Sequence, residues 1–117
     1  MARRDVYSDV CPSRVLLDLL ANKWSALAIG LLERGPARFT VLQSRMEGVS
    51  PKMLTRTLRR LESAQLVTRT IYPEVPPRVE YALTDLGVSA SIPLRLMCNW
   101  AEEHVDRIDA LNREWAS

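Results

Sequence analysis

Apolar residues recur every three or four positions along most of the chain, and the clearest example is the segment 50–65. At about 100° per residue, its leucines fall on one stripe, while basic and hydroxyl side chains fall on the opposite side. The stripe is Leu54, Leu58 and Leu61, and the opposite side carries Lys52, Thr55, Arg56 and Arg59. Ser50 is a good N-cap, and Pro51 suits the first helical position. The pattern predicts a helix over about 51–64 with one apolar face and one cationic face.

The segment before this helix has a shorter helical pattern. Phe39, Leu42 and Met46 recur at helical spacing, and a short turn that contains Gly48 separates them from Ser50. Two helices joined by such a turn, the second with a basic exposed face, are typical of a helix-turn-helix. In that motif the second helix lies in the major groove of DNA.

Strand-like alternation of side chains follows in residues 66–72 and again in residues 78–83. Between them, the proline-rich segment 73–77 can form neither the interior of a helix nor a central strand. Two strands joined by such a tip predict a wing over about 66–83. The expected fold is therefore a winged helix-turn-helix of the α+β class, mainly α with a small β-wing.

Two apolar helices are predicted before the helix-turn-helix. Pro12 lies in the first turn of one of them, and Asn22 caps the other, which Gly35 and Pro36 end. The residues expected to be buried are Val15, Leu16, Leu19 and Leu20 in the first helix, and Trp24, Leu27, Leu31 and Leu32 in the second. A tryptophan at a core spacing is expected to pack inside the protein and not to stack on a base. Residues 1–10 are polar and are expected to form a flexible N-terminal arm.

The C-terminal region carries a second long stripe. Thr84 is expected to cap a helix, and the predicted C-terminal dimerisation helices cover about 85–115. From Leu94 onward the stripe is Met97, Trp100, His104, Ile108, Leu111 and Trp115. It is most economically buried against the same helix of a second copy, with Leu16 of the N-terminal helix in the same interface. The alternative is that this helix folds back on the first helix of its own chain, and the two arrangements are compatible.

Composition limits the class of protein. The 117 residues are 47% hydrophobic and 26% charged, with a mean hydropathy of −0.10, which fits one globular domain over residues 11–117. The apolar runs are too short to span a membrane and the N-terminus lacks an apolar signal core, so we expect a cytoplasmic protein with no membrane partner. Two cysteines in that compartment are expected to be reduced thiols, and their spacing is not that of a metal site.

Charge is unevenly distributed along the chain, although the net charge is only +2. Residues 37–78 contain eight basic and three acidic side chains, whereas residues 79–117 contain three basic and seven acidic ones. A basic middle and an acidic tail suit a protein that presents one face to a polyanion.

Several stretches resemble the HxlR family of bacterial transcription regulators. They are Cys11-Pro12, Asn22-Lys23-Trp24, Arg38-Phe39, SPKMLT at 50–55, LRRLE at 58–62, Leu66-Val67, Trp100-Ala101-Glu102 and above all the wing sequence YPEVPPRVEYALT at 72–84. The resemblance covers residues 11 to about 104. It implies a homodimeric winged-helix DNA-binding protein related to MarR-type regulators. It also implies that the N-terminal cysteine is, in some members, a sensor of electrophiles or oxidants.

The cationic helix and the wing suggest specific contacts with DNA. The expected DNA-binding residues are Arg38, Arg45, Ser50, Pro51, Lys52, Thr55, Arg56, Arg59 and Arg78. Arg56 is the expected base reader, because arginine donates two hydrogen bonds to guanine in the major groove. Ser50 and the helix N-terminus are expected to bind a phosphate. Arg78 is expected to enter a narrow minor groove. For each arginine the alternative is a solvated surface position, and about half of them are expected to touch DNA.

Cys11 is a candidate redox-sensing residue. At a helix N-terminus, the helix dipole and Arg14 would lower the pKa of its thiol and raise its reactivity. The hypothesis is that oxidation or alkylation of Cys11 changes the dimer and its affinity for DNA, and the alternative is an unreactive cap position. Cys98 is expected to be a small buried apolar side chain. Whether Cys11 and Cys98 pair across the dimer stays open, because sequence does not give the distance between their Cα atoms.

The sequence therefore predicts a DNA-binding transcriptional regulator, a repressor by default, that binds a pseudo-palindromic operator as a homodimer. The alternative is a winged-helix adaptor that binds proteins without DNA, for which a mixed or acidic helix face is expected. An enzyme is not expected, because the chain has one histidine, no glycine-rich phosphate loop and no cluster of carboxylates with metal spacing. No cofactor is expected, and no set of residues indicates the chemistry of an effector.

Overall fold

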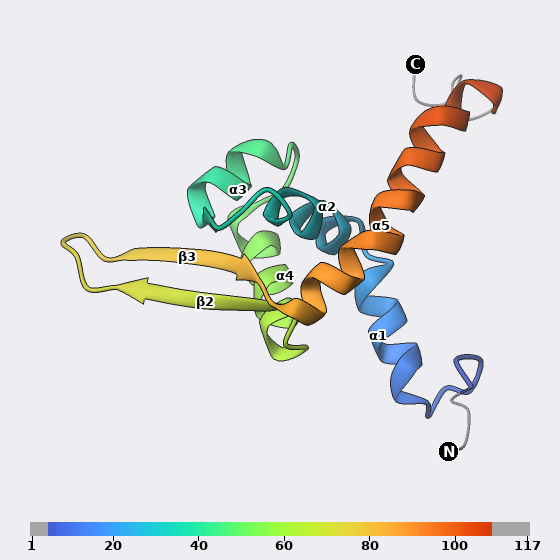
Figure 1. Ribbon diagram of the computed structural model, residues 1–117, viewed down its shortest axis with the longest axis horizontal. Helices are drawn as coiled ribbons and strands as arrows, with labels where there is room; N and C mark the ends of the chain where they lie inside the picture. The colour runs from blue at the N-terminus through green and yellow to red at the C-terminus, as the bar shows by residue number, and fades with distance from the viewer. Residues whose placement is uncertain (1–4, 109–117) are drawn as a thin grey trace.

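The computed structural model describes residues 5–108, which form helices around a small antiparallel sheet (Figure 1). The elements in chain order are α1 (Pro12–Leu20), α2 (Lys23–Leu32), β1 (Ala37–Arg38), α3 (Phe39–Arg45), α4 (Pro51–Ser63), β2 (Val67–Tyr72), β3 (Arg78–Leu83), α5 (Asp85–His104) and a short 3-10 helix (Val105–Arg107). The order of α3, turn, α4 and a two-stranded wing confirms the predicted mainly α fold with a small β-wing.

The core lies between α2, α3, α4 and the start of β2. Its most deeply buried side chains are Ala28, Ile29, Leu42, Leu54, Leu58, Leu61 and Leu66. The predicted apolar stripe of α4 is thus confirmed, and it includes one polar residue, Thr57, that the pattern did not single out. Trp24 is also in the core, as predicted, and its ring lies 3.7 Å from the position that a Cβ on Gly48 would occupy. Trp24 therefore packs against the turn between α3 and α4.

Three predicted helix caps are present. The Ser50 Oγ accepts a hydrogen bond from the Met53 N–H at 3.1 Å, and the Asn22 Oδ1 accepts one from the Trp24 N–H at 2.9 Å. The Thr84 Oγ1 accepts from the Gly87 N–H at 3.0 Å. These bonds satisfy backbone donors that have no partner inside their own helix, which fixes where α4, α2 and α5 begin.

The sheet has the strand order β1-β3-β2. β2 and β3 pair in antiparallel register from Val67 with Leu83 to Tyr72 with Arg78, and the wing they form projects from the body (Figure 1). β1 was not predicted. It has two residues, which is too short for an alternating pattern, and it pairs Ala37 with Tyr81 on the other edge of β3.

The predictions for the two N-terminal helices were partly wrong. In α1 only Leu19 is buried, while Val15 and Leu16 are exposed, and in α2 Leu27 is exposed. The physical reason is visible in Figure 1, where α1 and α5 diverge on the side opposite the wing, so no described element covers the outer side of α1. α5 packs against α2 through Leu94 and does not run alongside α1.

The predicted C-terminal stripe is only partly described. α5 ends at His104 and a 3-10 helix follows, so Ile108 does not continue the same α-helical face. Leu111 and Trp115 lie outside the described residues. At the other end, residues 5–10, part of the expected arm, form hydrogen-bonded turns, with the Cys11 N–H donating to the Ser8 carbonyl at 3.2 Å.

The described part of the chain is flat and extended, with dimensions of 51 × 47 × 23 Å. Its Cα radius of gyration is 16.4 Å, whereas a compact domain of this length has a value of about 13 Å. The diverging helices α1 and α5 account for the difference. Within the described residues no single helix could cross a bilayer, and by length and composition alone the bent pair of α1 and α2 could.

Candidate nucleic-acid interface

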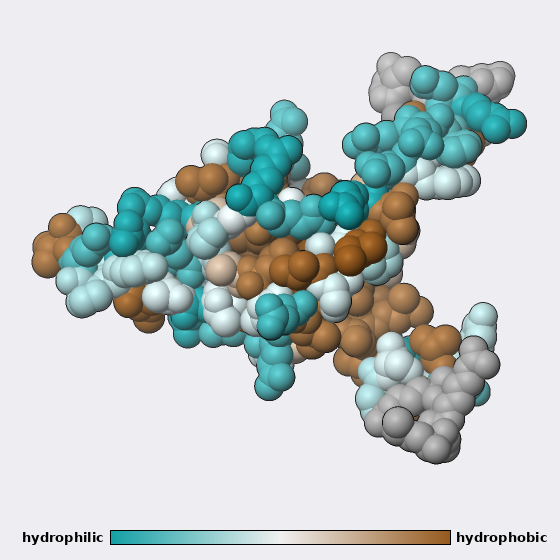
Figure 2. Space-filling model, in the orientation of Figure 1, coloured by the Kyte–Doolittle hydropathy of each residue, from teal (hydrophilic) through white to brown (hydrophobic). Residues whose placement is uncertain are grey.

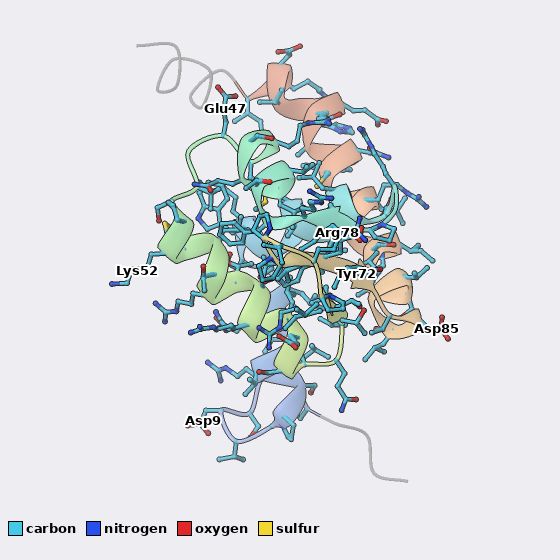
Figure 3. The ribbon with its side chains drawn as sticks, turned by 90° about the vertical axis from the view of Figure 1, so that its left-hand side faces the viewer. Asp9, Glu47, Lys52, Tyr72, Arg78 and Asp85 are labelled. Carbon is cyan, nitrogen blue, oxygen red and sulfur yellow. The ribbon has the colours of Figure 1, made fainter. Side chains whose placement is uncertain are left out.

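The outer face of α4 carries the basic side chains that the sequence placed there. Lys52, Arg56 and Arg59 are exposed and Thr55 is half-buried, while the leucines of the opposite face hold the helix on the core. Figure 3 looks toward the wing tip and shows Lys52 pointing outward from α4, to one side of the wing. An α-helix with this exposed surface fits the width of a major groove.

The basic side chains on this face differ from the neighbouring arginines in having no acidic partner among the described residues. Arg60 lies 3.5 Å from the Asp18 carboxylate on α1, and Arg69 lies 3.5 Å from Glu62. By contrast, Lys52, Arg56 and Arg59 form no ion pair with any residue between 5 and 108. We call the outward surface formed by Lys52, Thr55, Arg56 and Arg59 the cationic face. Its charge is available to an external anion.

The N-terminus of α4 has fewer free hydrogen-bond donors for an anion than the sequence suggested. The Ser50 Oγ accepts the hydrogen bond that caps the helix, and the Leu54 N–H donates to the Ser50 carbonyl at 2.9 Å. Pro51 has no N–H to donate. At the start of the helix, the Lys52 N–H and the Ser50 hydroxyl proton are the donors that remain for a phosphate.

Arg78 occupies the predicted position at the base of the wing tip, but its surroundings were not predicted. Its guanidinium carbon lies 4.1 Å from the centre of the Tyr72 ring, and its Nε lies 3.4 Å from Glu74 Oε2 and 3.9 Å from Glu80 Oε2. The Nε atom is buried, and no described residue accepts a hydrogen bond from it with good geometry, so both carboxylate contacts are electrostatic. Tyr72 and Arg78 lie beside each other in Figure 3.

Arg38 and Arg45 are not brought to one place. Arg38, on β1, lines a hollow of about 680 Å³ together with Phe39 and the wing tip, including Arg78. Arg45, at the end of α3, lines a different hollow of about 570 Å³ that also involves α2 and α5. Arg38 is thus a neighbour of the wing, whereas Arg45 is separated from it.

Cys11 lies where the sequence placed it, at the start of α1, whereas the burial predicted for Cys98 was wrong. Cys11 is buried at the N-cap of α1, with its Sγ 2.8 Å from the Ser13 Oγ. Cys98 was predicted to be buried and is exposed on α5, one turn beyond the buried Leu94. It lines the same hollow as Arg45.

Of the predicted dimer residues, Leu16 on α1 and Met97 and Trp100 on α5 are exposed, and further exposed apolar side chains lie on the same two helices. Among these large exposed side chains are Val15, Leu16 and Leu17 on α1 and Ile92, Leu96, Met97 and Trp100 on α5. We call these seven residues the apolar patch. Figure 2 shows hydrophobic surface over α1 and over the middle of α5. His104 is half-buried, stacks on the Trp100 ring at 4.5 Å and contacts the Trp100 carbonyl through Nδ1 at 2.8 Å.

Sequence reasoning missed the residues around Arg78. The sequence predicted the strand ends at residues 72 and 78, but the pairing of Tyr72 with Arg78 in the hairpin register was not inferred from them. The acidic residues Glu74 and Glu80 were counted only as negative charges. Alternation in β3 could have placed Arg78 and Glu80 on one face.

The chain matches one family model over most of its length. The model of the HxlR-like helix-turn-helix matches residues 19–109. An uncharacterized HTH-type transcriptional regulator from Methanothermobacter thermautotrophicus is 42% identical over 93 residues, which make up 80% of this chain and 71% of that protein. The uncharacterized HTH-type transcriptional regulator YtfH from Escherichia coli is 35% identical over 113 residues, or 97% of this chain and 90% of YtfH.

Solved structures that resemble this chain are also those of regulators. The structure of ytfH from Salmonella typhimurium, described as a transcriptional regulator, has a TM-score of 0.88 at 35% identity and covers 95% of this chain and 99% of its own. The redox regulator HypR in its reduced form has a TM-score of 0.77 at 31% identity and covers 85% of this chain and 98% of its own.

Proposed function

This chain belongs to the HxlR-like helix-turn-helix family of transcriptional regulators, and we propose that it binds a pseudo-palindromic operator in double-stranded DNA as a homodimer. In this proposal the cationic face of α4 lies in the major groove, with Arg56 as the base reader. Arg78 of the wing enters the adjacent minor groove, whose negative potential attracts a guanidinium. The Lys52 N–H, Ser50 and Arg38 bind flanking phosphates and set the register.

The observation that carries this proposal is the absence of internal partners for the cationic face. Lys52, Arg56 and Arg59 have no ion pair among residues 5–108, although Arg60 on the same helix has one. Unpaired basic side chains on one face of a helix attract phosphates over a long range and release counterions when they bind. A protein adaptor has no need of such a face.

Fluorescence anisotropy with a labelled random-sequence duplex tests the proposal. We expect the affinity to fall steeply between about 50 mM and about 200 mM salt, because each neutralised phosphate releases a counterion. Arg56→Ala should weaken binding and reduce the slope against salt by about one. Arg60→Ala is the matched control, since that arginine is on the same helix but is paired with Asp18.

Two results would reject the proposal. A flat response to salt would favour the protein-adaptor alternative. Equal losses in Arg56→Ala and Arg60→Ala would mean that the cationic face has no special role and that only the total charge of α4 matters.

The homodimer is supported by the apolar patch. Trp100, Met97 and Val15 are each at least 60% exposed, and large apolar side chains exposed on a small protein mark an interaction site when a partner can cover them. The partner we propose is a second copy, because a twofold dimer places two identical α4 helices on the two halves of a palindrome.

Repression is the regulatory outcome we propose. A dimer on an operator that overlaps a promoter excludes RNA polymerase without any further contact. The test is in vitro transcription from a promoter that carries the selected operator, in which added protein should lower the transcript yield. A rise in yield would instead make the protein an activator.

A redox response through Cys11 is the most specific part of the proposed function. It is supported by the likeness to a structure named as a redox regulator and by the Ser13 hydroxyl 2.8 Å from the Cys11 Sγ, which can donate a hydrogen bond to a thiolate. Diamide should reduce operator affinity in the wild type but not in Cys11→Ser. Cys98→Ser is the matched control, because that thiol is exposed on α5. If diamide acts equally on all three proteins, Cys11 is not the sensor.

A further inference from the structure

The side chains around Arg78 are arranged on one face of the wing. Tyr72 and Arg78 are the last pair in the hairpin register before the tip, and Glu80 pairs with Thr70 two positions further along β3. Because side chains alternate along a strand, Arg78 and Glu80 lie on the same face. Glu74 reaches this face from the tip.

Arg78 approaches both carboxylates with the Nε side of its guanidinium. Both carboxylate contacts are to Nε, at 3.4 Å from Glu74 and 3.9 Å from Glu80, and the Tyr72 ring covers the guanidinium plane at 4.1 Å. The Nε atom is buried, yet the side chain as a whole is 29% exposed. The exposed part therefore belongs to other atoms of the side chain, which ends in the two terminal Nη groups. Those groups are the ones that bind two acceptors at once.

We propose that Tyr72, Glu74 and Glu80 are positioning and specificity-determining residues that hold Arg78 with its terminal Nη groups presented to the minor groove. This inference rests on the proposed function, because it assumes that the wing contacts DNA. It assigns a role to three residues that would not themselves touch the bases.

Tyr72 and the carboxylates act in two ways. Stacking on Tyr72 and attraction to Glu74 limit the conformations of a long side chain before DNA arrives, which lowers the entropy lost on binding. The two carboxylates also place more negative than positive charge on this face of the wing, and they repel phosphates. Binding of the wing to any duplex is thereby weakened, while binding to a narrow, A·T-rich minor groove, where the negative potential is strongest, is retained.

Selection from a double-stranded random-sequence library tests this inference. Wild type should enrich a central core read by α4 and, beside it, A·T pairs under the wing. Glu74→Gln, which removes one charge and keeps the shape, should bind the unselected library about threefold more tightly because a repulsion is lost. The same variant should reduce the A·T preference beside the core about fivefold, which is the size of a lost base-pair preference, and leave the core unchanged.

Two more variants separate positioning from folding. Tyr72→Leu should lose the A·T preference, and Tyr72→Phe, which keeps an aromatic face for the guanidinium, should retain it. Arg38→Ala is the control for a phosphate contact near the wing, and it should weaken binding to all sequences equally. Replacing A·T by inosine·C beside the core preserves the minor-groove pattern of acceptors, so wild type should bind that duplex as it binds A·T.

The possible outcomes are distinct. The inference is overturned if Glu74→Gln and Tyr72→Leu keep the wild-type A·T preference, or if Glu74→Gln binds the unselected library more weakly. It is also overturned if wild type selects a core with no preference beside it, although the proposed function then stands. If wild type selects no core, the proposed function fails as well.

Discussion

At the scale of single residues, two glycines in helices have opposite roles. A Cβ on Gly87, in the first turn of α5, would collide with the backbone carbonyl of Leu66 and approach the Leu83 side chain to 3.1 Å. A Cβ on Gly30, in the middle of α2, would meet no atom within 4 Å. Gly87 is therefore required for the close packing of α5 on the wing, whereas packing within the described chain does not require Gly30.

The same substitution at these two positions should have opposite effects. Gly87→Ala should lower the free energy of unfolding by about 3 kcal/mol through overpacking. Gly30→Ala should raise it by about 1 kcal/mol, because alanine favours a helix more than glycine does. Urea unfolding of both variants measures the two changes. A destabilised Gly30→Ala would show that an atom outside the described residues occupies that space.

The raised pKa of Tyr81 on β3 predicts how the free energy of unfolding depends on pH. Burial raises the pKa of its phenol above the usual 10.0, Glu62 acts in the same direction, and Arg69 and Arg59 oppose them. In the unfolded chain the phenol loses its proton at lower pH than in the folded chain. Stability from this residue is therefore complete below the unfolded pKa and is lost as the pH rises through the raised folded pKa.

The measurement compares variants under alkaline conditions. Between about pH 9 and about pH 11, where tyrosine titrates, the free energy of unfolding should fall less in Tyr81→Phe than in wild type. Tyr7→Phe is the control, because Tyr7 is 90% exposed. Equal falls in the two variants would exclude a contribution from Tyr81.

At the scale of elements, sequence predicted best where local chemistry decides the structure. The start of α4 follows from Ser50 and Pro51 alone, and its buried stripe from the spacing of its leucines, so both were correct. β1 could not be predicted, because two residues become a strand only through pairing with β3. The burial of α1 was misjudged for a related reason, since periodicity shows that a face is apolar but not whether its own chain covers it.

The cap of α4 can be tested separately from the DNA binding proposed for this helix. Ser50→Ala removes the acceptor of the Met53 N–H and should lower the free energy of unfolding by about 1 kcal/mol. Ser63→Ala, at the exposed C-terminal end of the same helix, should change it by less than about 0.5 kcal/mol. Thermal unfolding without DNA gives both values. If the two variants unfold alike, the capping bond contributes nothing to stability.

The candidate site, like the fold, could be predicted from the sequence only in part. Lys52, Arg56 and Arg59 were placed correctly, because exposure on an amphipathic helix follows from the position of its leucines. The surroundings of Arg78 were not predictable, since they depend on hairpin register and on side chains from three positions. Cys98 was misplaced because its neighbours Met97 and Trp100 are themselves exposed.

At the scale of the whole molecule, the extended shape and the apolar patch predict that stability depends on protein concentration. If the folded state is a dimer, its midpoint temperature rises with concentration by mass action. Leu96→Asp places a charge in the patch and should abolish this dependence and yield a monomer in sedimentation. Val41→Asp, at an exposed apolar position on α3 outside the patch, should leave the dimer intact. A wild type that sediments as a monomer at all concentrations would contradict the proposed dimer.

The ion pair between Asp18 and Arg60 joins a helix of the apolar patch to the helix that would read DNA. Leu19, the next residue of α1, is buried in the core that α4 shares. In the proposed dimer, a change in the tilt of α1 would reach α4 through this ion pair without passing through the wing. If both proposals hold, a single ion pair on the surface connects the site of assembly to the helix that selects the operator.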